Sequence, residues 1–373
     1  MRFLRIVALT AGAAYLTWRL LFTWEGANPV LFFLLFAAEA FGVVRFAMET
    51  SLLGDPRPAT RAPVLGIAPD ADVIVVVTDE PTSEVRAAVL SAQLVTGYRE
   101  ILIVDRDDRP QVRELADRLG IRRIAGGWNA DLGELIDTAV ASSNSLFALL
   151  VPADVVVMPD VLEAVGPTFD DAEVGVVACR IENTNAAHEV DFGGYGEELV
   201  RDALMVGRLD AAGALPWWPG MAVVRRSALV EAGGMSPGRS GVMLATGVRI
   251  QAAGWRITDV PVVTARRLAP WTDDRHLHRW ARGLHERLAV LVDSEAPRRG
   301  EHSTRLMRRV YRAADLHVGR AIQRLVLIGI LVATLFSSWL PMVAEPPVLV
   351  GLWGAWMATS VAYRRHAVRS IGF

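Results

Sequence analysis

The sequence predicts an α/β domain carried between two pairs of membrane-spanning helices. Apolar residues gather in long runs near both ends of the chain, whereas the middle alternates short β-branched runs with helical segments. Arginines flank the apolar runs on one side. The chain of 373 residues is 52% hydrophobic and has a mean hydropathy of +0.30, which is more apolar than an ordinary soluble domain.

Four apolar runs are each close to the roughly 20 residues that a membrane helix needs. They cover residues 3–24, 29–48, 325–343 and 347–363. The first run contains Arg5 and Arg19, the second contains Glu39 and Arg45, and the last two contain no charge. We therefore expect four spans, with a cleaved signal peptide as the alternative for the first run.

The distribution of arginine predicts the orientation of these spans, because short cytosolic flanks retain positive charge. Arginines precede the first and third runs and follow the fourth, and the two connecting turns have none. Both termini and the central region are therefore expected in the cytosol. Within the first pair of spans, Arg19 either reaches the outer interface or pairs with Glu39.

Charge and cysteine content exclude several classes of protein. The 39 basic and 41 acidic side chains give a formal net charge of −2, so no overall field favours a nucleic acid. No lysine occurs, and every basic side chain other than histidine is arginine. Cys179 is the single cysteine, which excludes an intrachain disulfide and a four-cysteine zinc site.

The central region predicts a mostly parallel sheet with helices on both faces. Strands are expected at 73–77, 101–104, 122–124 and 146–151, and helices at 83–94, 110–119 and 131–142. Gly120 should end the second of these helices. Because ligands of such sheets bind beyond the carboxyl ends of the strands, the segments 78–81, 105–109 and 152–154 are the candidate site.

The turn after the first strand excludes a dinucleotide-binding dehydrogenase, because it reads Thr-Asp-Glu-Pro and not G-x-G-x-x-G. What the strand ends share is a set of carboxylates: Glu80, Asp105, Asp107 and Asp154. Such groups suit a ribose or base edge and a divalent cation that carries a diphosphate. Each of them is also compatible with an ordinary turn or helix cap.

Several segments match, in order, the motifs of one enzyme family. IVDRDDRP at 103–110 is similar to V-D-D-G-S-R-P, LLVPAD at 149–154 resembles the stretch around D-x-D, WWPGM at 217–221 resembles F-F-C-G-T, and HLHRW at 276–280 stands in place of Q-x-x-R-W. Over nearly its whole length the chain resembles the membrane-embedded family-2 glycosyltransferases of the cellulose synthase type. That resemblance implies a GT-A, Rossmann-like cytosolic domain with two amino-terminal and two carboxy-terminal transmembrane helices.

The resemblance also implies roles for individual residues. A nucleotide-sugar, with a UDP-sugar expected, would be held by Thr78, Glu80, Asp105 and Asp107. Magnesium or manganese would bind at Asp154. The acceptor and the diphosphate would be contacted by Trp217, Trp218, Gly220, Arg279 and Trp280. Packing in the core is the alternative for the tryptophan pair.

The catalytic motifs depart from the family pattern. Pro152 stands where D-x-D has its first carboxylate, and the family's general base falls on Gly241, Val242 and Met243, none of which accepts a proton. His276 replaces a glutamine, and 125–127 lacks a lysine. Possible replacement bases are Glu197, Glu198, Asp202, Asp210 and His276.

Two functions of different class follow. The chain would transfer a hexose to a membrane-associated or polysaccharide acceptor, or it would be an inactive pseudo-glycosyltransferase that assists an active synthase. The expected domains are a hairpin at 1–54, a linker at 55–69, the GT-A domain at 70–270, amphipathic interface helices at 271–324 and a second hairpin with a basic tail at 325–373. This organisation predicts a multi-pass protein of the bacterial inner (plasma) membrane that has no nucleic-acid partner.

Overall fold

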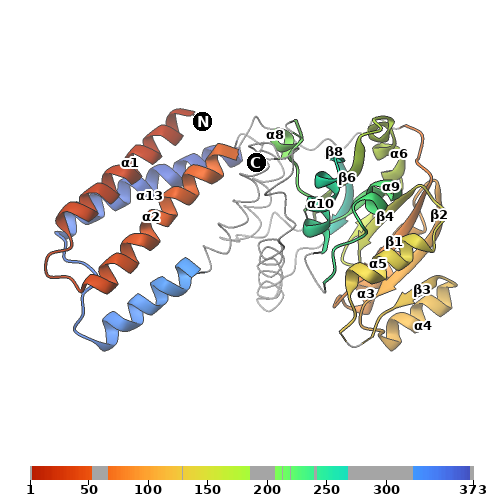
Figure 1. Ribbon diagram of the computed structural model, residues 1–373, viewed down its shortest axis with the longest axis horizontal. Helices are drawn as coiled ribbons and strands as arrows, with labels where there is room; N and C mark the ends of the chain where they lie inside the picture. Colours follow the sequence, from red (N-terminus) through yellow and green to blue (C-terminus); the bar gives the residue numbers. More distant parts are fainter. Residues whose placement is uncertain are drawn as a thin grey trace. The chain divides into compact units, whose positions relative to one another are not determined.

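The computed structural model describes residues 2–52, 66–127, 129–184, 206–211, 213–218, 220–238, 242–267 and 322–369. The chain divides into two compact units (Figure 1). One unit contains the helices near the two ends, and the other is an α/β domain that covers Arg57–Tyr195 and Leu209–Arg308. Each unit is described by itself below.

Eight strands form one sheet in the described part of the α/β unit, in the order β3-β2-β1-β4-β7-β6-β8-β5. Their bounds are β1 Ala71–Val77, β2 Tyr98–Asp105, β3 Arg122–Ala125, β4 Phe147–Pro152, β5 Val156–Val157, β6 Val174–Asn183, β7 Ala222–Arg225 and β8 Arg256–Arg267. The predicted strands are thus confirmed, and β5 to β8 extend the sheet beyond them.

The sheet is mixed and not wholly parallel. β3, β2, β1 and β4 run parallel, β7 is antiparallel to β4 and β6, and β8 is parallel to β6. In the register of the parallel half, Val77 lies opposite Asp105, and Val76 lies opposite Pro152. The ends of β2, β1 and β4 are therefore neighbours at one edge of the sheet.

The helices of this unit begin and end where local sequence signals place them. They are α3 Thr82–Ala92, α4 Pro110–Leu119, α5 Leu132–Ala141, α6 Val161–Val165, α9 Arg226–Glu231 and α10 Val242–Ala252, and α8 Val206–Ala211 lies partly in each unit. Pro110 occupies the first turn of α4, and Gly120 ends it at a φ of +64°. Asp131 caps α5 by accepting a hydrogen bond from the Glu134 amide.

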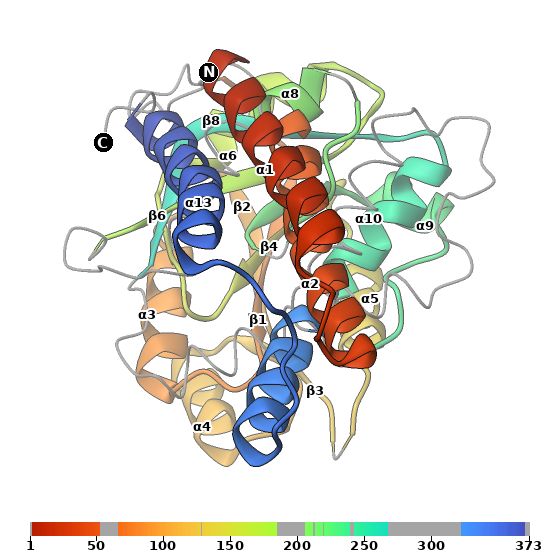
Figure 2. The same ribbon diagram turned by 90° about the vertical axis from the view of Figure 1, so that its left-hand side faces the viewer.

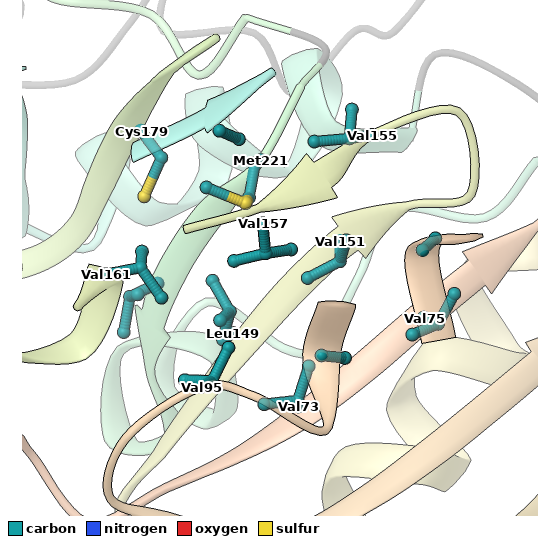
Figure 3. Packing of buried hydrophobic residues seen from close by; sticks show 14 of the residues in the cluster. Val73, Val75, Val95, Leu149, Val151, Val155, Val157, Val161, Cys179 and Met221 are labelled. Carbon is teal, nitrogen blue, oxygen red and sulfur yellow. The ribbon is translucent and has the colours of Figure 1, made fainter. Parts of the chain in front are cut away.

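A continuous apolar core lies on one face of the sheet. It combines side chains of β1 and β4 with buried residues of α3, α4 and α6. Figure 3 shows Leu149, Val157 and Met221 gathered at its centre, with Cys179 at one side. The buried side chains of α5, α9 and α10 are not part of this cluster, although these helices contact the sheet, so they cover the opposite face.

The helical unit contains α1 Arg2–Phe22, α2 Pro29–Leu52, a helix at Ile322–Phe336 and α13 Pro346–Arg369. Figure 2 shows α1 and α13 side by side, and Tyr15 of α1 stacks on Trp356 of α13 with ring centroids 6.3 Å apart. Phe46 of α2 meets Tyr363 of α13 edge to face at 5.6 Å. Aromatic contacts thus join segments that are more than 300 residues apart in the sequence.

Arg19 pairs with Glu39 and does not reach for the outer interface. The Arg19 side chain is fully buried, and its Nε lies 3.0 Å from Glu39 Oε2. Tyr15 donates a 2.8 Å hydrogen bond to the other oxygen of the same carboxylate, and Arg19 also donates to the Thr23 hydroxyl. The charged group within the first apolar run is therefore held inside the hairpin.

The prediction for the carboxy-terminal end of the third span is wrong. The helix stops at Phe336 and not at Val343; beyond it the Trp339 amide donates to the Ser337 hydroxyl, and Pro341 follows. Among the described helices, α1 and α2 are the two that are long and apolar enough to cross a bilayer. The described part of the third helix, Ile322–Phe336, is shorter than a span, so the carboxy-terminal pair of spans is not confirmed.

Candidate functional site

The three predicted loops meet at the carboxyl edge of the parallel strands. Segments 78–81, 105–109 and 152–154 follow β1, β2 and β4, which are adjacent in the sheet order. Backbone hydrogen bonds join them: the Arg106 amide donates to the Val77 carbonyl, and the Ala153 amide donates to the Val76 carbonyl. The fold therefore brings together chain segments up to 76 residues apart, from 78 to 154.

Glu80 folds back over the end of β1. Its carboxylate accepts hydrogen bonds from the Thr78 amide at 2.7 Å and from the Thr78 hydroxyl at 2.8 Å. Burial raises the pKa of the Glu80 carboxyl, the bonds from Thr78 oppose this rise, and the nearby Asp154 carboxylate adds to it. Glu80 and Asp154 are thus close enough to interact, as the sequence predicts for two groups at adjacent strand ends.

Asp105 is fully buried and holds the β2–α4 turn together. Its Oδ2 accepts bonds from the Arg109 amide at 2.9 Å and from Arg123 at 3.0 Å. Arg123 also reaches Asp108 at 2.7 Å, and Asp108 has a φ of +48°. Burial raises the pKa of Asp105, and the Arg109 and Arg123 contacts oppose that rise. Its Oδ2 is therefore bonded within the protein, whereas its buried Oδ1 has no hydrogen-bond partner among the described residues; that Asp105 binds the nucleotide stays a prediction.

Arg106 follows β2, and its positive charge interacts with acidic side chains at the ends of both β1 and β2. It forms a two-point pair with Asp107, at 2.7 Å and 3.1 Å. The hydrogen bond and charge of Asp107 raise the pKa of the guanidinium, and Asp79 and Glu80 contribute to that rise. Asp107 itself remains one-third exposed, so it lies at the surface of the edge as predicted.

Arg109 lies in the predicted segment 105–109, but the sequence assigns it no role. Its Nη1 donates to the Glu80 carbonyl at 2.5 Å, and its Nε lies 3.7 Å from Asp105 Oδ1. Its Nη2 is buried and has no acceptor among the described residues. Arg109 thus brings a guanidinium with an unused donor to the ends of β1 and β2.

Asp154 faces an arginine. Its Oδ2 lies 3.8 Å from Nη1 of Arg267, the last described residue of β8, and both side chains are about four-fifths buried, at 19% and 18% exposure. The described residues contain no group of three or more histidine, cysteine, aspartate or glutamate side chains that could hold a metal ion. With Glu80 bonded to Thr78 and Asp154 beside a fixed cation, this donor set does not fit a divalent ion.

Trp217 is part of the core. It is fully buried, and Gly247 of α10 lies so close that an added Cβ would approach Trp217 Cβ to 2.7 Å. This favours the packing alternative for Trp217 and leaves it no exposed face for a sugar. Trp218 and Gly220 are partly exposed in the same segment. Arg279, Trp280 and His276 lie outside the described residues.

The expected position of the general base is the start of α10. Val242 is its first residue and is buried, and Met243 is half-buried. Neither side chain accepts a proton. Asp210 lies on α8, whereas Gly241, Glu197, Glu198 and Asp202 lie outside the described residues.

Comparison with solved structures defines the fold. The mannosyltransferase PcManGT from Pyrobaculum calidifontis, in complex with GDP-Man and Mn2+, superposes with a TM-score of 0.58 at 17% identity, covering 99% of this chain and 97% of that one. The chain therefore has the fold of a GT-A glycosyltransferase. Glucosyl-3-phosphoglycerate synthase from Mycobacterium tuberculosis overlaps less, with a TM-score of 0.43 at 18% identity over 61% of this chain and 80% of that one. No protein-family model and no curated protein sequence matches the chain.

Proposed function

We propose that this chain binds a nucleotide-diphospho-sugar at the carboxyl edge of β1, β2 and β4 and transfers its hexose to a membrane-associated or polysaccharide acceptor. The observation that carries this proposal is the meeting of Glu80, Asp107 and Asp154 with Arg106 and Arg109 at one edge of a GT-A sheet. The finer assignment, to the family-2 enzymes of the cellulose synthase type, rests on the sequence motifs.

The residues at this edge suit the two ends of such a donor. The carboxylates of Glu80 and Asp107 have lone pairs left to accept hydrogen bonds from ribose hydroxyls or a base edge, as acceptors at strand ends do in other α/β sites. Arg106 and Arg109 present fork-shaped donors that match phosphate oxygens. A fixed positive charge placed near the leaving diphosphate stabilises the negative charge that develops during transfer.

The base of the donor is not determined by these contacts. The sequence motifs favour a uridine nucleotide, and the mannosyltransferase of similar fold was crystallised with GDP-Man. A test of donor preference should therefore include both UDP-glucose and GDP-mannose. Mannose as the transferred sugar is included in that test on the strength of the fold match.

A lipid bilayer is the proposed partner of the helical unit. Within their most apolar stretches, 22% of α1 and 28% of α2 is buried, whereas a core helix of a soluble protein is mostly buried. Large apolar side chains face outward on these helices and on the helix at Ile322–Phe336, among them Phe3, Ile6, Leu21, Phe33, Leu325 and Phe336. Such a surface favours lipid over water.

The arginine distribution supports a cytosolic α/β unit on this membrane. Arg2 and Arg5 stand in the first turns of α1, and Arg364, Arg365 and Arg369 stand in the last turns of α13. The turn between α1 and α2 contains no arginine. This asymmetry supports the proposal that the chain ends and the α/β unit face the cytosol, where soluble nucleotide-sugars are found.

A second candidate function is favoured by the start of α10. A buried Val242 and a half-buried Met243 replace the groups that would take the proton of the acceptor hydroxyl. A positioned base contributes about 10²- to 10⁴-fold to such a reaction, so its loss would leave binding without useful turnover. The chain would then be a sugar-nucleotide-binding subunit of an active synthase.

Binding and turnover of radiolabelled donors separate these functions. We expect calorimetric titration of the purified full chain with UDP-glucose and GDP-mannose to show saturable binding of at least one donor. Arg106→Gln should weaken this binding about tenfold or more, because a charged hydrogen bond is lost. Arg122→Gln, which removes an exposed arginine at the opposite end of β3, is the matched control and should bind normally.

Transfer of label into the lipid or polysaccharide fraction of native membranes would support the transferase. Saturable binding with no transfer, even when membranes supply acceptors, would support the inactive subunit. If neither donor binds, the proposed nucleotide-sugar site is wrong for both functions.

A further inference from the structure

The Asp154–Arg267 pair joins the β4–β5 turn to the end of β8 at the proposed donor site, beside the pairing of β5 with β8. Asp154 follows β4, and Arg267 ends β8, with 3.8 Å between Oδ2 and Nη1. The Arg267 carbonyl accepts a 2.9 Å bond from the Thr184 amide, which fixes the backbone at the end of β8. The guanidinium therefore has a defined position beside the one carboxylate that remains of the metal-binding motif.

The net charge of this part of the site is compatible with an arginine beside Asp154. A divalent cation held by two carboxylates leaves the edge of the site with no net charge before the diphosphate arrives. Here Pro152 has replaced one carboxylate, and one arginine beside the other gives the same balance. The site thus has one carboxylate fewer and one arginine more. The positive charge of that arginine lies where a metal ion would otherwise meet the phosphate oxygens.

We propose that Arg267 acts in place of a divalent cation, so that the nucleoside diphosphate is held by guanidinium groups and binds without metal. This inference rests on the proposed nucleotide-sugar site. Asp154 then orients Arg267 and is not a metal ligand. A guanidinium offers several N–H donors in a planar fork, so it contacts the paired phosphate oxygens directly.

Other features of the site agree with this assignment. The described residues contain no cluster of potential metal ligands. Arg106 and Arg109 stand at the ends of β1 and β2, and Arg109 has a buried donor with no acceptor among the described residues. Every fixed cation available to the diphosphate is an arginine, because the chain contains no lysine.

The test is calorimetric binding of UDP and GDP, and of UDP-glucose and GDP-mannose, to the full chain in EDTA and in manganese or magnesium. We expect the affinity in EDTA to lie within about threefold of the affinity with metal. Arg267→Gln should weaken binding about tenfold or more in both conditions. Arg266→Gln is the matched control, because the neighbouring Arg266 pairs with Glu182 and is about half exposed.

Binding that requires manganese or magnesium and disappears in EDTA would overturn the inference while supporting the proposed function. Unchanged binding by Arg267→Gln, in a variant whose melting temperature equals that of the wild type, would also overturn it. Absence of binding under every condition would contradict the proposed function, and the inference with it.

Discussion

Arg123 holds two carboxylates of the β2–α4 turn at once. Its Nη1 lies 3.0 Å from Asp105 and 2.7 Å from Asp108, and its side chain is mostly buried. Arg122, the residue before it, pairs with Glu100 on an exposed surface. Adjacent residues of one strand thus offer a direct comparison between a buried and an exposed ion pair.

We expect Arg123→Ala to destabilise the chain by about 3 kcal/mol, because the fully buried Asp105 would lose a counter-charge. The melting temperature should fall by roughly 6 °C or more. Arg122→Ala should cost at most about 1 kcal/mol. Equal melting temperatures for the two variants would show that Arg123 does not organise the turn.

Glu80 predicts a pH dependence of stability. Burial raises its pKa above the ordinary 4.5, so the folded chain binds this proton more tightly than the unfolded chain. The contribution of this group is complete below about pH 4.5 and is lost as the pH rises through the folded-state pKa. Glu80→Gln should therefore gain stability relative to the wild type as the pH rises across this window.

Thermal unfolding measured between about pH 4 and pH 7 checks this sign. Glu114→Gln, on the exposed side of α4, is the control and should run parallel to the wild type. If the unfolding free energy of Glu80→Gln minus that of the wild type stays constant or falls with rising pH, the raised pKa is contradicted.

The carboxylates of the site could be predicted from the sequence, but the arginines could not. Glu80, Asp107 and Asp154 directly follow β-branched or apolar runs, so parallel topology alone brings them to one edge. Whether Arg109 or Arg267 turns toward that edge depends on loop geometry and on strand β8, which no local pattern predicts. The role of Trp217 could not be predicted for a related reason. The same Trp-Trp sequence is compatible with stacking on a sugar and with packing against Gly247.

At the scale of elements, Gly120 marks the end of α4. Its φ of +64° is strained for any residue with a side chain, and an added Cβ would meet no atom within 4 Å. Gly120→Ala should therefore cost about 1 kcal/mol through backbone conformation alone. Gly127→Ala, also in open space but at no positive φ, should change the unfolding free energy by less than about 0.5 kcal/mol.

Chemical denaturation of both glycine variants measures the difference. If Gly127→Ala is as costly as Gly120→Ala, the left-handed backbone is not what gives Gly120 its role.

The Arg19–Glu39 pair joins α1 to α2. Glu39→Leu alone would leave a fully buried guanidinium without its counter-ion, at a cost of about 3 kcal/mol or more. The double variant Arg19→Leu with Glu39→Leu should recover most of that loss, because replacement of both charges leaves no unpaired ion. Melting temperatures of the full chain in mild detergent test this, and a double variant no more stable than Glu39→Leu would contradict it.

Element types in the α/β unit followed the sequence patterns closely. The bounds of α4 agree with prediction because proline and glycine mark its two ends. The predicted third span extended too far toward the carboxyl end, because hydropathy alone does not show where a helix ends. Ser337, Pro341 and the bond from the Val343 amide to the Thr23 carbonyl turn the chain there.

At the scale of the whole molecule, the fold is better determined than the chemistry. The superposition with the mannosyltransferase extends over 99% of the chain, so it includes both terminal helix groups as well as the sheet. A shared fold carries no catalytic residue with it. Here Val242, the first residue of α10, accepts no proton, and Asp154 lies beside Arg267, so the fold alone does not give the chemistry.

The central claim is that a nucleotide-sugar binds at the carboxyl edge of β1, β2 and β4. Amide hydrogen exchange of the full chain, with and without saturating donor, tests it most directly. We predict slower exchange at 78–81, 105–109 and 152–154 when GDP-mannose or UDP-glucose is present. Slower exchange confined to another place, such as the groove between α3 and α4 lined by Arg86 and Arg118, or no change at all, would contradict the claim.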